Sequence, residues 1–380
     1  MSFERVGFRT SGAGLEIDLD AVADNYRFLQ TAVAPAAIAG VVKADAYGLG
    51  ATEVSGALVR AGCRHLFVAN LDEALALLPS TPPAVAIYVL NGLAPGSEGC
   101  AADAGLIPVL NTHRQVEAWR HLSTHRREPL SAILHVDSGM SRLGLSEHHI
   151  AALAREPRLF QDLDVRYLMT HLACADEPDA ASNAAQLVAF RRRVEALPPR
   201  PLSIANSAAA LSGFARPDDL VRVGLALYGG APLTGRGNPM RPVAHLTVRV
   251  LQVRGVPEGI GVGYGLTHVM AKAGRIATIE AGYADGWPRA LGNRGGVYWG
   301  DRRLPIIGQV SMDSMTVDIS ELPVGALIEG DSVELIGPHQ SLEAVAQDAG
   351  TISYEILTRL GRRFARLYAA RGTTRSGSET

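Results

Sequence analysis

The stretch Leu66-Phe67-Val68-Ala69-Asn70-Leu71-Asp72-Glu73-Ala74-Leu75-Ala76-Leu77-Leu78 shows a pattern that recurs along the chain. A short apolar run is followed by a polar residue and then by a segment with the period of a helix. Strands that alternate with helices form parallel sheets with right-handed crossovers. Seven more apolar runs lie between residues 39 and 230, at Gly40–Val42, Val85–Val89, Ile107–Leu110, Ala132–Val136, Val165–Met169, Leu202–Ile204 and Leu220–Gly224. The sequence therefore predicts an α/β fold with eight parallel strands. We favour a closed (β/α)8 TIM-type barrel over a doubly wound open sheet.

A segment rich in proline and glycine, residues 231–242, interrupts this rhythm. Short apolar runs joined by Gly, Pro and Asp turns follow it, and they indicate strands. The expected strands are Ala244–Val253, Arg275–Glu280, Gly296–Trp299, Leu304–Val310, Ser314–Ile319 and Asp331–Ile336, with one helix at Ser341–Ala349. We therefore predict two domains, a barrel over residues 1–240 and a mainly β domain over residues 241–380.

Composition excludes several classes of protein. The 380 residues are 47% hydrophobic, and 36 basic against 38 acidic residues give a net charge of −2, so a basic surface for nucleic acid is not expected. Cys63, Cys100 and Cys174 are odd in number and lack Cys-x-x-Cys spacing, which disfavours disulfides and structural zinc. The start, Met1–Arg9, is too charged for a signal peptide, and no apolar run reaches the length of a membrane span. We expect a cytoplasmic protein without metal, nucleic acid or membrane partners.

Polar residues follow most of the apolar runs, and these positions share one end of the predicted barrel, where barrel enzymes carry their active sites. They are Lys43, Asn70, Asn91, Asn111, Asp137, His171, Asn206 and Arg222. Asparagine is also the residue expected at helix N-caps and turns. Lys43, His171 and Arg222 are therefore the stronger evidence for an active site at this end of the barrel.

Lys43 would project from a strand end into a partly dry cavity, where its amine becomes available as a nucleophile or base. Equally, its side chain could extend to solvent. After the last two strands, Asn206-Ser207 and Gly224-Leu225 provide a hydroxyl, small side chains and a glycine, as barrel phosphate sites do. A lysine able to form an imine beside a phosphate site suggests pyridoxal phosphate, and a sugar-phosphate enzyme of the same fold is the alternative.

Arg222 bears on the kind of chemistry. An arginine opposite the pyridine nitrogen of such a cofactor would leave that nitrogen unprotonated and favour simple proton exchange over decarboxylation or elimination. If the side chain points outward instead, it forms an ordinary surface salt bridge.

The segment Val41-Val42-Lys43-Ala44-Asp45-Ala46-Tyr47-Gly48-Leu49-Gly50 resembles the pyridoxal-lysine motif of bacterial alanine racemases, which are fold-type III pyridoxal enzymes. The likeness continues in order through Asp137–Gly144, Thr170–Asp176, Ala205–Ser207, Val221–Gly229, Val262–Gly265, Gly282–Trp287, Ser311–Asp313 and Ser353-Tyr354. Ordered agreement over nearly the whole chain is much more specific than one short pattern.

The resemblance implies a head-to-tail homodimer that binds pyridoxal 5'-phosphate and interconverts L- and D-alanine, with D-alanine supplied for peptidoglycan. Lys43 would bond to the cofactor and act as one acid/base. The partner subunit's Tyr264 would act on the opposite face of the substrate. Racemisation requires two such bases, since one removes the α-proton and the other returns a proton on the other side.

Further roles follow from the same resemblance. Tyr47, Ser207, Gly224, Leu225 and Tyr354 would hold the phosphate, His171 would lie against the cofactor ring, and Asn206 and Arg222 would also bind the cofactor. Arg142 would bind the substrate carboxylate and Met312 would contact the substrate from the partner chain. Asp176, Tyr283 and Asp313 would lie near the path to the site.

Two positions depart from the family pattern. The family commonly has a lysine, often carbamylated, where this chain has His135, so the usual negative partner of Arg142 cannot form. Gln309 stands where many relatives have an arginine beside the substrate corridor, which could shift substrate choice.

Three alternatives stay open. A racemase of serine, lysine or a broad range of amino acids is the first, because one methylene or hydroxyl changes binding by only about 1–3 kcal/mol. A basic amino-acid decarboxylase is the second, although Arg222 and the lack of any cysteine after Cys174 count against it. A non-catalytic pyridoxal-phosphate carrier is the third, although such barrels lack the 140 residues from 241 to 380.

Overall fold

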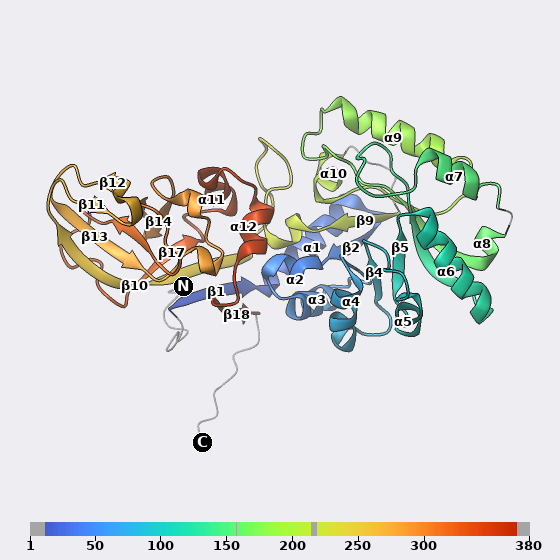
Figure 1. Cartoon of the computed structure of the whole chain (residues 1–380), viewed down its shortest axis with the longest axis horizontal. Helices are drawn as coiled ribbons and strands as arrows, with labels where there is room; N and C mark the ends of the chain where they lie inside the picture. The colour runs from blue at the N-terminus through green and yellow to red at the C-terminus, as the bar shows by residue number, and fades with distance from the viewer. Residues whose placement is uncertain (1–11, 157, 214–218, 371–380) are drawn as a thin grey trace, which may run out of the picture. The chain divides into compact units, whose positions relative to one another are not determined.

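A computed structural model describes residues 12–156, 158–213 and 219–370, and their contacts divide them into two compact units (Figure 1). The barrel unit contains residues 22–46 and 50–241. The β unit contains the described residues up to Ala21, the short segment Tyr47–Leu49 and the described residues from Pro242 onward.

Eight parallel strands form the sheet of the barrel unit, in the order β8-β7-β6-β5-β4-β3-β2-β9. Hydrogen bonds also join the two end strands, from the N–H of Arg222 to the carbonyl of Ala205 (3.0 Å) and from the N–H of Asp219 to that of Leu202 (3.0 Å). The sheet thus nearly closes on itself, and the predicted TIM-like barrel is confirmed. Its strands are β2 (Ala37–Val41), β3 (His65–Val68), β4 (Ala86–Val89), β5 (Ile107–Leu110), β6 (Leu130–His135), β7 (Leu163–Met169), β8 (Leu202–Ser203) and β9 (Leu220–Val223).

Helices follow the strands and lie outside them (Figure 1). Polar side chains at the strand ends start several of these helices. Asn70 Oδ1 accepts the N–H of Glu73 (3.0 Å) and Thr112 Oγ1 accepts that of Gln115 (3.2 Å), which satisfies donors that a first helical turn leaves free. The helices are α1 (Leu19–Val33), α2 (Lys43–Gly48), α3 (Ala51–Arg60), α4 (Leu71–Leu77), α5 (Glu98–Asp103), α6 (His113–Arg126), α7 (Glu147–Leu153), α8 (Leu159–Asp162), α9 (Ala181–Val194) and α10 (Ser207–Ser212).

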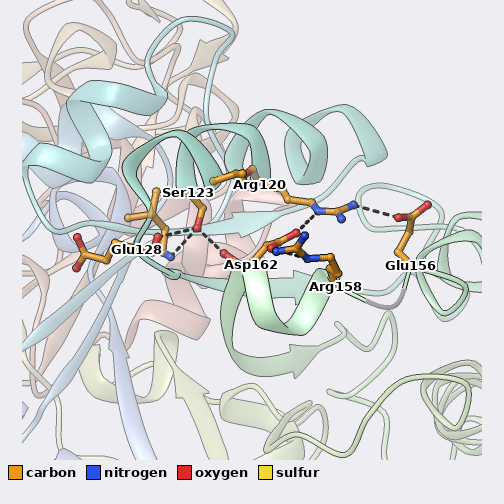
Figure 2. Close-up of polar contacts among 8 residues, drawn as sticks. Arg120, Ser123, Glu128, Glu156, Arg158 and Asp162 are labelled. Atoms are coloured by element: carbon orange, nitrogen blue, oxygen red, sulfur yellow. Dashed lines mark hydrogen bonds and ion pairs between the residues drawn. The ribbon is translucent and has the colours of Figure 1, made fainter.

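A polar cluster fixes α6 against α8 (Figure 2). Arg120 binds Asp162 through Nε (2.8 Å) and Glu156 through a terminal nitrogen (3.2 Å). The hydroxyl of Ser123, one turn further along α6, donates to the carbonyl of Glu128 (2.7 Å) and also contacts that of Asp162. These contacts hold the end of α6 and the start of β6.

The β unit has a second eight-stranded sheet, in the order β13-β16-β15-β14-β17-β10-β1-β18, and β13 also pairs with β10. Six of its strands therefore close into a ring. The strands are β1 (Ala13–Asp18), β10 (Ala244–Val256), β13 (Gly274–Ile279), β14 (Gly296–Trp299), β15 (Arg302–Ile307), β16 (Met315–Asp318), β17 (Ser332–Ile336) and β18 (Ala365–Ala369). A hairpin, β11 (Gly261–Val262) with β12 (His268–Val269), and the helices α11 (Leu342–Ala349) and α12 (Ser353–Arg359) complete the unit.

The first strand differs from the division that we predicted at residue 240. β1 pairs antiparallel with β10, where Leu15 lies opposite Leu246, and parallel with β18. Contacts therefore assign the described residues up to Ala21 to the β unit rather than to the barrel. The partners of β1 are more than two hundred residues away along the chain, so local sequence patterns do not reveal this pairing.

Two findings concern the cysteines and the membrane. All three cysteines, Cys63, Cys100 and Cys174, are free thiols, and Cys63 is buried. In the part of the chain that the structure describes, no helix combines the length and the apolar character needed to cross a bilayer.

Candidate active site

Lys43 lies two residues after the end of β2 and opens a left-handed turn. The four residues after it have φ angles between 52° and 58°, and Gly48 continues the turn with φ 85°. Residues other than glycine adopt this left-handed region at a cost of roughly 1–2 kcal/mol each. Gly48 also lacks room for a side chain, since a Cβ there would lie 2.7 Å from the carbonyl oxygen of Leu357. Strained backbone of this kind is concentrated at functional sites.

The amine of Lys43 lies in an environment that disfavours its charge. Burial lowers the pKa of Lys43, the positive charges of Arg142 and Arg222 lower it further, and the carboxylate of Glu73 partly opposes them. An amine that loses its proton more easily is a better nucleophile and base.

Arg222 is buried within the barrel and donates to four acceptors. Its guanidinium binds Ser203 Oγ (2.6 Å), the carbonyls of Thr170 (2.8 Å) and Ile204 (3.3 Å), and His171 Nδ1 (3.3 Å). The arrangement differs from the surface salt bridge considered for this residue. Because a guanidinium can only donate hydrogen bonds, Nδ1 of His171 accepts and the proton of the neutral ring is on Nε2.

His171 stays uncharged near neutral pH. Burial lowers the pKa of His171 to about 3, and the nearby charge of Arg222 contributes next. Gln186 on α9 holds the same segment, since its Nε2 donates to the carbonyl of His171 (3.1 Å) and its Oε1 accepts the N–H of Ala173 (2.9 Å). The ring therefore has a fixed position and a fixed tautomer.

His135, which departs from the family pattern, is neutral and pairs with an asparagine. Its Nδ1 lies 2.6 Å from Asn111 Oδ1. Asn111 Nδ2 donates to the carbonyls of Leu90 and Val109, both at 2.9 Å, so the amide cannot be reversed and His135 must donate. Burial, followed by the charge of Arg222, lowers the pKa of His135 to about 4.

Donor groups gather where the chain leaves β8 and β9. Ser207 Oγ accepts the N–H groups of Gly224 (2.9 Å) and Ala226 (3.4 Å), so its own hydrogen remains available. The N–H groups of Ser207 and Leu225 meet no acceptor among the described residues, although each of these residues is 3% exposed. Asn206 caps α10 by accepting two of its N–H groups (3.1 and 3.0 Å). A phosphate fits this place, because it would supply the missing acceptors.

Arg142 lies in the loop after β6 and is exposed. Its charge acts on Lys43, His171 and His135, since it lowers the pKa of each. It is thus within electrostatic range of all three side chains at this end of the barrel. A carboxylate is the natural ligand of such a cation.

Other predicted residues belong to the β unit. Tyr264, between β11 and β12, is 73% exposed and is flanked by Gly263 and Gly265, with φ angles of 70° and 69°. Met312 is 53% exposed, and its carbonyl accepts the N–H of Ala284 (2.9 Å).

Tyr283 lies in the same part of the β unit, where its N–H donates to the carbonyl of Ser311 (3.0 Å). Arg363 binds both Asp285 (3.0 Å) and Asp313 (2.6 Å), which ties the two loops together. Asp313 is therefore engaged in an ion pair.

Tyr47 and Tyr354 contact each other within the β unit. Their ring centroids are 5.9 Å apart with an interplanar angle of 37°. Burial raises the pKa of Tyr47, so its hydroxyl keeps its proton. Two phenols side by side are suitable donors for an anion.

The structure thus brings Lys43, Arg142, His171 and Arg222 to one end of the barrel, with Ser207 and its neighbours at the last two strands. Sequence reasoning missed three supporting residues, Glu73, Gln186 and Ser203. Glu73 follows Asn70 by three residues, a spacing typical of helix N-termini, so its position in the sequence alone does not indicate a role at Lys43.

The comparisons agree over both units. The N-terminal domain of alanine racemase matches residues 17–232, and the C-terminal domain of alanine racemase matches residues 243–368. A catabolic alanine racemase of Agrobacterium fabrum is 48% identical over 369 residues, which are 96% of this chain and 94% of that protein. An alanine racemase of Brucella ovis is 48% identical over 371 residues, 94% of each chain.

A solved structure shows that the fold is similar as well. The crystal structure of the alanine racemase of Bartonella henselae with covalently bound pyridoxal phosphate superposes with a TM-score of 0.92 at 43% identity, covering 94% of this chain and 100% of that one. The resemblance found in the sequence is confirmed, and this chain belongs to the alanine racemase family.

Proposed function

We propose that this protein interconverts L-alanine and D-alanine by exchanging the α-proton between two bases. It is a pyridoxal-phosphate-dependent amino-acid racemase. The observation that carries the mechanistic proposal is the amine of Lys43, whose pKa is lowered at one end of the barrel. At the same end, the N–H groups of Ser207 and Leu225 have no acceptor within the described ranges of the chain.

The cofactor site follows from these donors. The hydroxyl and N–H of Ser207 and the N–H of Leu225 would hold the phosphate next to Gly224, with Asn206 setting the start of α10 beside them. Tyr47 and Tyr354 would add phenolic donors, by analogy with the family. Lys43 would carry the covalent link. When bound, pyridoxal phosphate withdraws electrons from the Cα of an attached amino acid and acidifies its α-proton.

Arg222 and His171 would control protonation around that group. The guanidinium of Arg222 can only donate, so beside a ring nitrogen it would leave that nitrogen without a proton. Nε2–H of His171, fixed by Arg222, would donate to the phenolic oxygen of the partner subunit's Tyr264. Lys43 and the partner subunit's Tyr264 would then take and return the proton on opposite faces.

Substrate recognition would use Arg142 for the carboxylate and the partner subunit's Met312 for contact across the interface. Asp176, Tyr283, Gln309 and Asp313 would border the path to the site. The positive charge of Arg142, which acts on both Lys43 and His171, supports a substrate with a carboxylate.

A homodimer that shares its active sites is part of the proposal. The hairpin that carries Tyr264 also exposes Leu266 (61%) and Val269 (56%). Clustered apolar side chains of this kind indicate an interaction surface. Light scattering behind size-exclusion chromatography should give twice the mass of the 40.2 kDa chain.

Cell-wall supply is the physiological role that we propose, in the cytoplasm, where three free thiols are stable. The relative in Agrobacterium fabrum is named a catabolic alanine racemase. An experiment must therefore distinguish synthesis of D-alanine from its breakdown. Expression in a D-alanine auxotroph should restore growth without added D-alanine. A failure to rescue, with active enzyme in the lysate, would favour the catabolic role.

The decisive experiment incubates the purified protein separately with L-alanine, L-serine and L-lysine and measures the D-enantiomers by chiral chromatography. A second sample is reduced with borohydride, digested and analysed by mass spectrometry. We expect fast conversion of alanine and a cofactor trapped on Lys43. Faster conversion of serine or lysine would make the protein a racemase of another amino acid, and a trap elsewhere would refute the role of Lys43.

A further inference from the structure

The carboxylate of Glu73 lies at the start of the turn that follows Lys43. Its Oε1 accepts the N–H of Ala44 (2.8 Å) and its Oε2 accepts the N–H of Ala69 (2.7 Å). Glu73 therefore links the residues that follow β2 and β3, the two strands next to each other at this side of the barrel. Hydrogen bonds to an ionised carboxylate are roughly twice as strong as neutral ones.

The backbone just before Lys43 is fixed as well. Val42 donates its N–H to the carbonyl of Phe67 (2.8 Å), and the buried hydroxyl of Tyr228 donates to the carbonyl of Val41 (2.8 Å). On the other side, the N–H of Ala44 is the first donor after the lysine, and Glu73 accepts it. The peptide that joins Val41 to Val42 and the peptide that joins Lys43 to Ala44 are thus held by named partners.

Left-handed backbone needs such support. Ala44 has φ 52°, and three more non-glycine residues follow in the same region. A residue of this kind returns to right-handed or extended backbone unless its surroundings fix it. If Ala44 turned, the direction of the Lys43 side chain would change with it.

We propose that Glu73 is a positioning residue for Lys43: its carboxylate holds the first peptide of the left-handed turn and thereby directs the amine toward the end of the barrel. The inference rests on the proposed role of Lys43 and extends it to a residue on a neighbouring βα unit.

Charge gives Glu73 a second effect on the same amine. The titratable and charged groups that interact electrostatically with Lys43 are Glu73, Arg142, Arg222 and His171. Burial, Arg142 and Arg222 all lower the pKa of the lysine. Glu73 is the carboxylate among the charges that act on it in the described part of the chain, and it raises this pKa. Asp45, in the turn itself, accepts the N–H of Ala51 (2.8 Å).

A helix cap is the competing explanation. Glu73 lies in the first turn of α4, and acceptors there stabilise helices whatever lies nearby. Asn70 provides the matched control, because it caps the same helix by accepting the N–H of Glu73 (3.0 Å). A capping role predicts equal effects from Glu73→Gln and Asn70→Ala, whereas positioning predicts an effect from Glu73→Gln alone.

The sequence makes the measurement simple, because the chain has only two lysines, Lys43 and the exposed Lys272. The full-length chain, freed of cofactor with hydroxylamine, is labelled with a trace of acetic anhydride between pH 6 and pH 11. Mass spectrometry then gives the labelling of Lys43 relative to that of Lys272. Hydrogen exchange of the peptide containing Ala44 is measured on the same samples.

We expect Glu73→Gln to move the labelling midpoint of Lys43 to lower pH, because the variant loses the negative charge that raises the pKa of the lysine. Glutamine offers one acceptor oxygen where two N–H groups need one each, so exchange at Ala44 should accelerate about tenfold. Glu73→Asp keeps the charge but is shorter, and should restore the midpoint while leaving exchange fast. Asn70→Ala should change neither.

Equal effects of Glu73→Gln and Asn70→Ala would overturn the proposal in favour of a helix cap, and so would no effect of Glu73→Gln on either readout. The labelling uses no cofactor and no turnover, so it is independent of the borohydride experiment. A shifted midpoint with no cofactor trapped on Lys43 would refute the proposed function and support the link between Glu73 and the amine.

Discussion

Nδ1 of His135, on β6, donates a hydrogen bond of 2.6 Å to Oδ1 of Asn111, which directly follows the neighbouring strand β5. The donor and acceptor cannot be exchanged, because the amide nitrogen of Asn111 already faces the carbonyls of Leu90 and Val109. The family pattern implies an anionic partner for Arg142 at this place. This chain has a neutral ring there, whose second nitrogen can only accept.

Asn111→Ala should destabilise the protein. The change leaves the buried Nδ1–H of His135 without its acceptor, and such a loss costs about 1–3 kcal/mol. The urea midpoint, followed by circular dichroism, measures it. Asn91→Ala is the control, because Asn91 lies two residues after the end of the neighbouring strand β4 and is exposed. Equal midpoints for the two variants would show that the pair contributes little to stability.

Acid should destabilise the protein through the two buried histidines. His135 and His171 have pKa values of about 4 and about 3 when folded, against about 6.5 when unfolded. The unfolded chain therefore binds more protons below pH 6.5, and the stabilisation present above that pH is lost as the pH falls toward 3. The slope is up to about 1.4 kcal/mol per pH unit for each ring.

Urea midpoints at pH 7 and pH 5 check this slope. His135→Gln keeps a donor for Asn111 but removes the titrating ring, so its midpoint should fall less between the two pH values. His125→Gln, at an exposed position on α6, should behave as the parent. Parallel curves for the parent and His135→Gln would contradict the assignment.

Ser207→Ala should weaken binding of pyridoxal phosphate about tenfold, equivalent to about 1.4 kcal/mol. The variant loses the hydroxyl that organises the N–H groups of Gly224 and Ala226 and keeps a hydrogen for an anion. Absorbance titration of the cofactor-free chain measures the affinity. Ser212→Ala, at the other end of α10, should bind as tightly as the parent. Unchanged affinity of Ser207→Ala would place the phosphate elsewhere.

Tyr264→Phe should retain the cofactor and reduce racemisation by about 10²- to 10⁴-fold, the contribution of one acid/base group. In deuterated water, exchange of the α-proton should slow for one enantiomer and continue for the other, because Lys43 still serves one face. NMR of the recovered alanine measures both. Tyr298→Phe is the matched control, since Tyr298 stacks on His339 in the β unit. Equal loss from both enantiomers would refute the two-base scheme.

Much of the barrel was predictable because parallel strands are buried on both faces and read as continuous apolar runs. All eight runs in the sequence coincide with strands, including β8, which has only two residues. Two strands of the other sheet, β1 and β18, were missed. Every residue of β18 is only half-buried, and β1 pairs with partners far along the chain, so neither gives a strong local pattern.

The sequence indicated which residue types gather at the candidate site, but it indicated fewer of the contacts between them. Asn70 and Asn206 are helix caps, as the simpler interpretation of strand-end asparagines had it. Asn111 is not, because Thr112 caps α6 and leaves Asn111 free to bind His135. The bond between Glu73 and Ala44 joins residues 29 positions apart, and only the parallel pairing of β2 with β3 brings them together.

The turn after Lys43 has a stereochemical consequence. At Ala44 and Ala46, where φ is 52° in both cases, the strain arises from the configuration of Cα and would disappear in its mirror image. A semisynthetic chain with D-residues at these two positions should therefore form the turn without backbone strain. The same exchange within α3 would disrupt a right-handed helix. Next to its reactive amine, the backbone of this L-protein follows the geometry preferred by amino acids of the opposite hand.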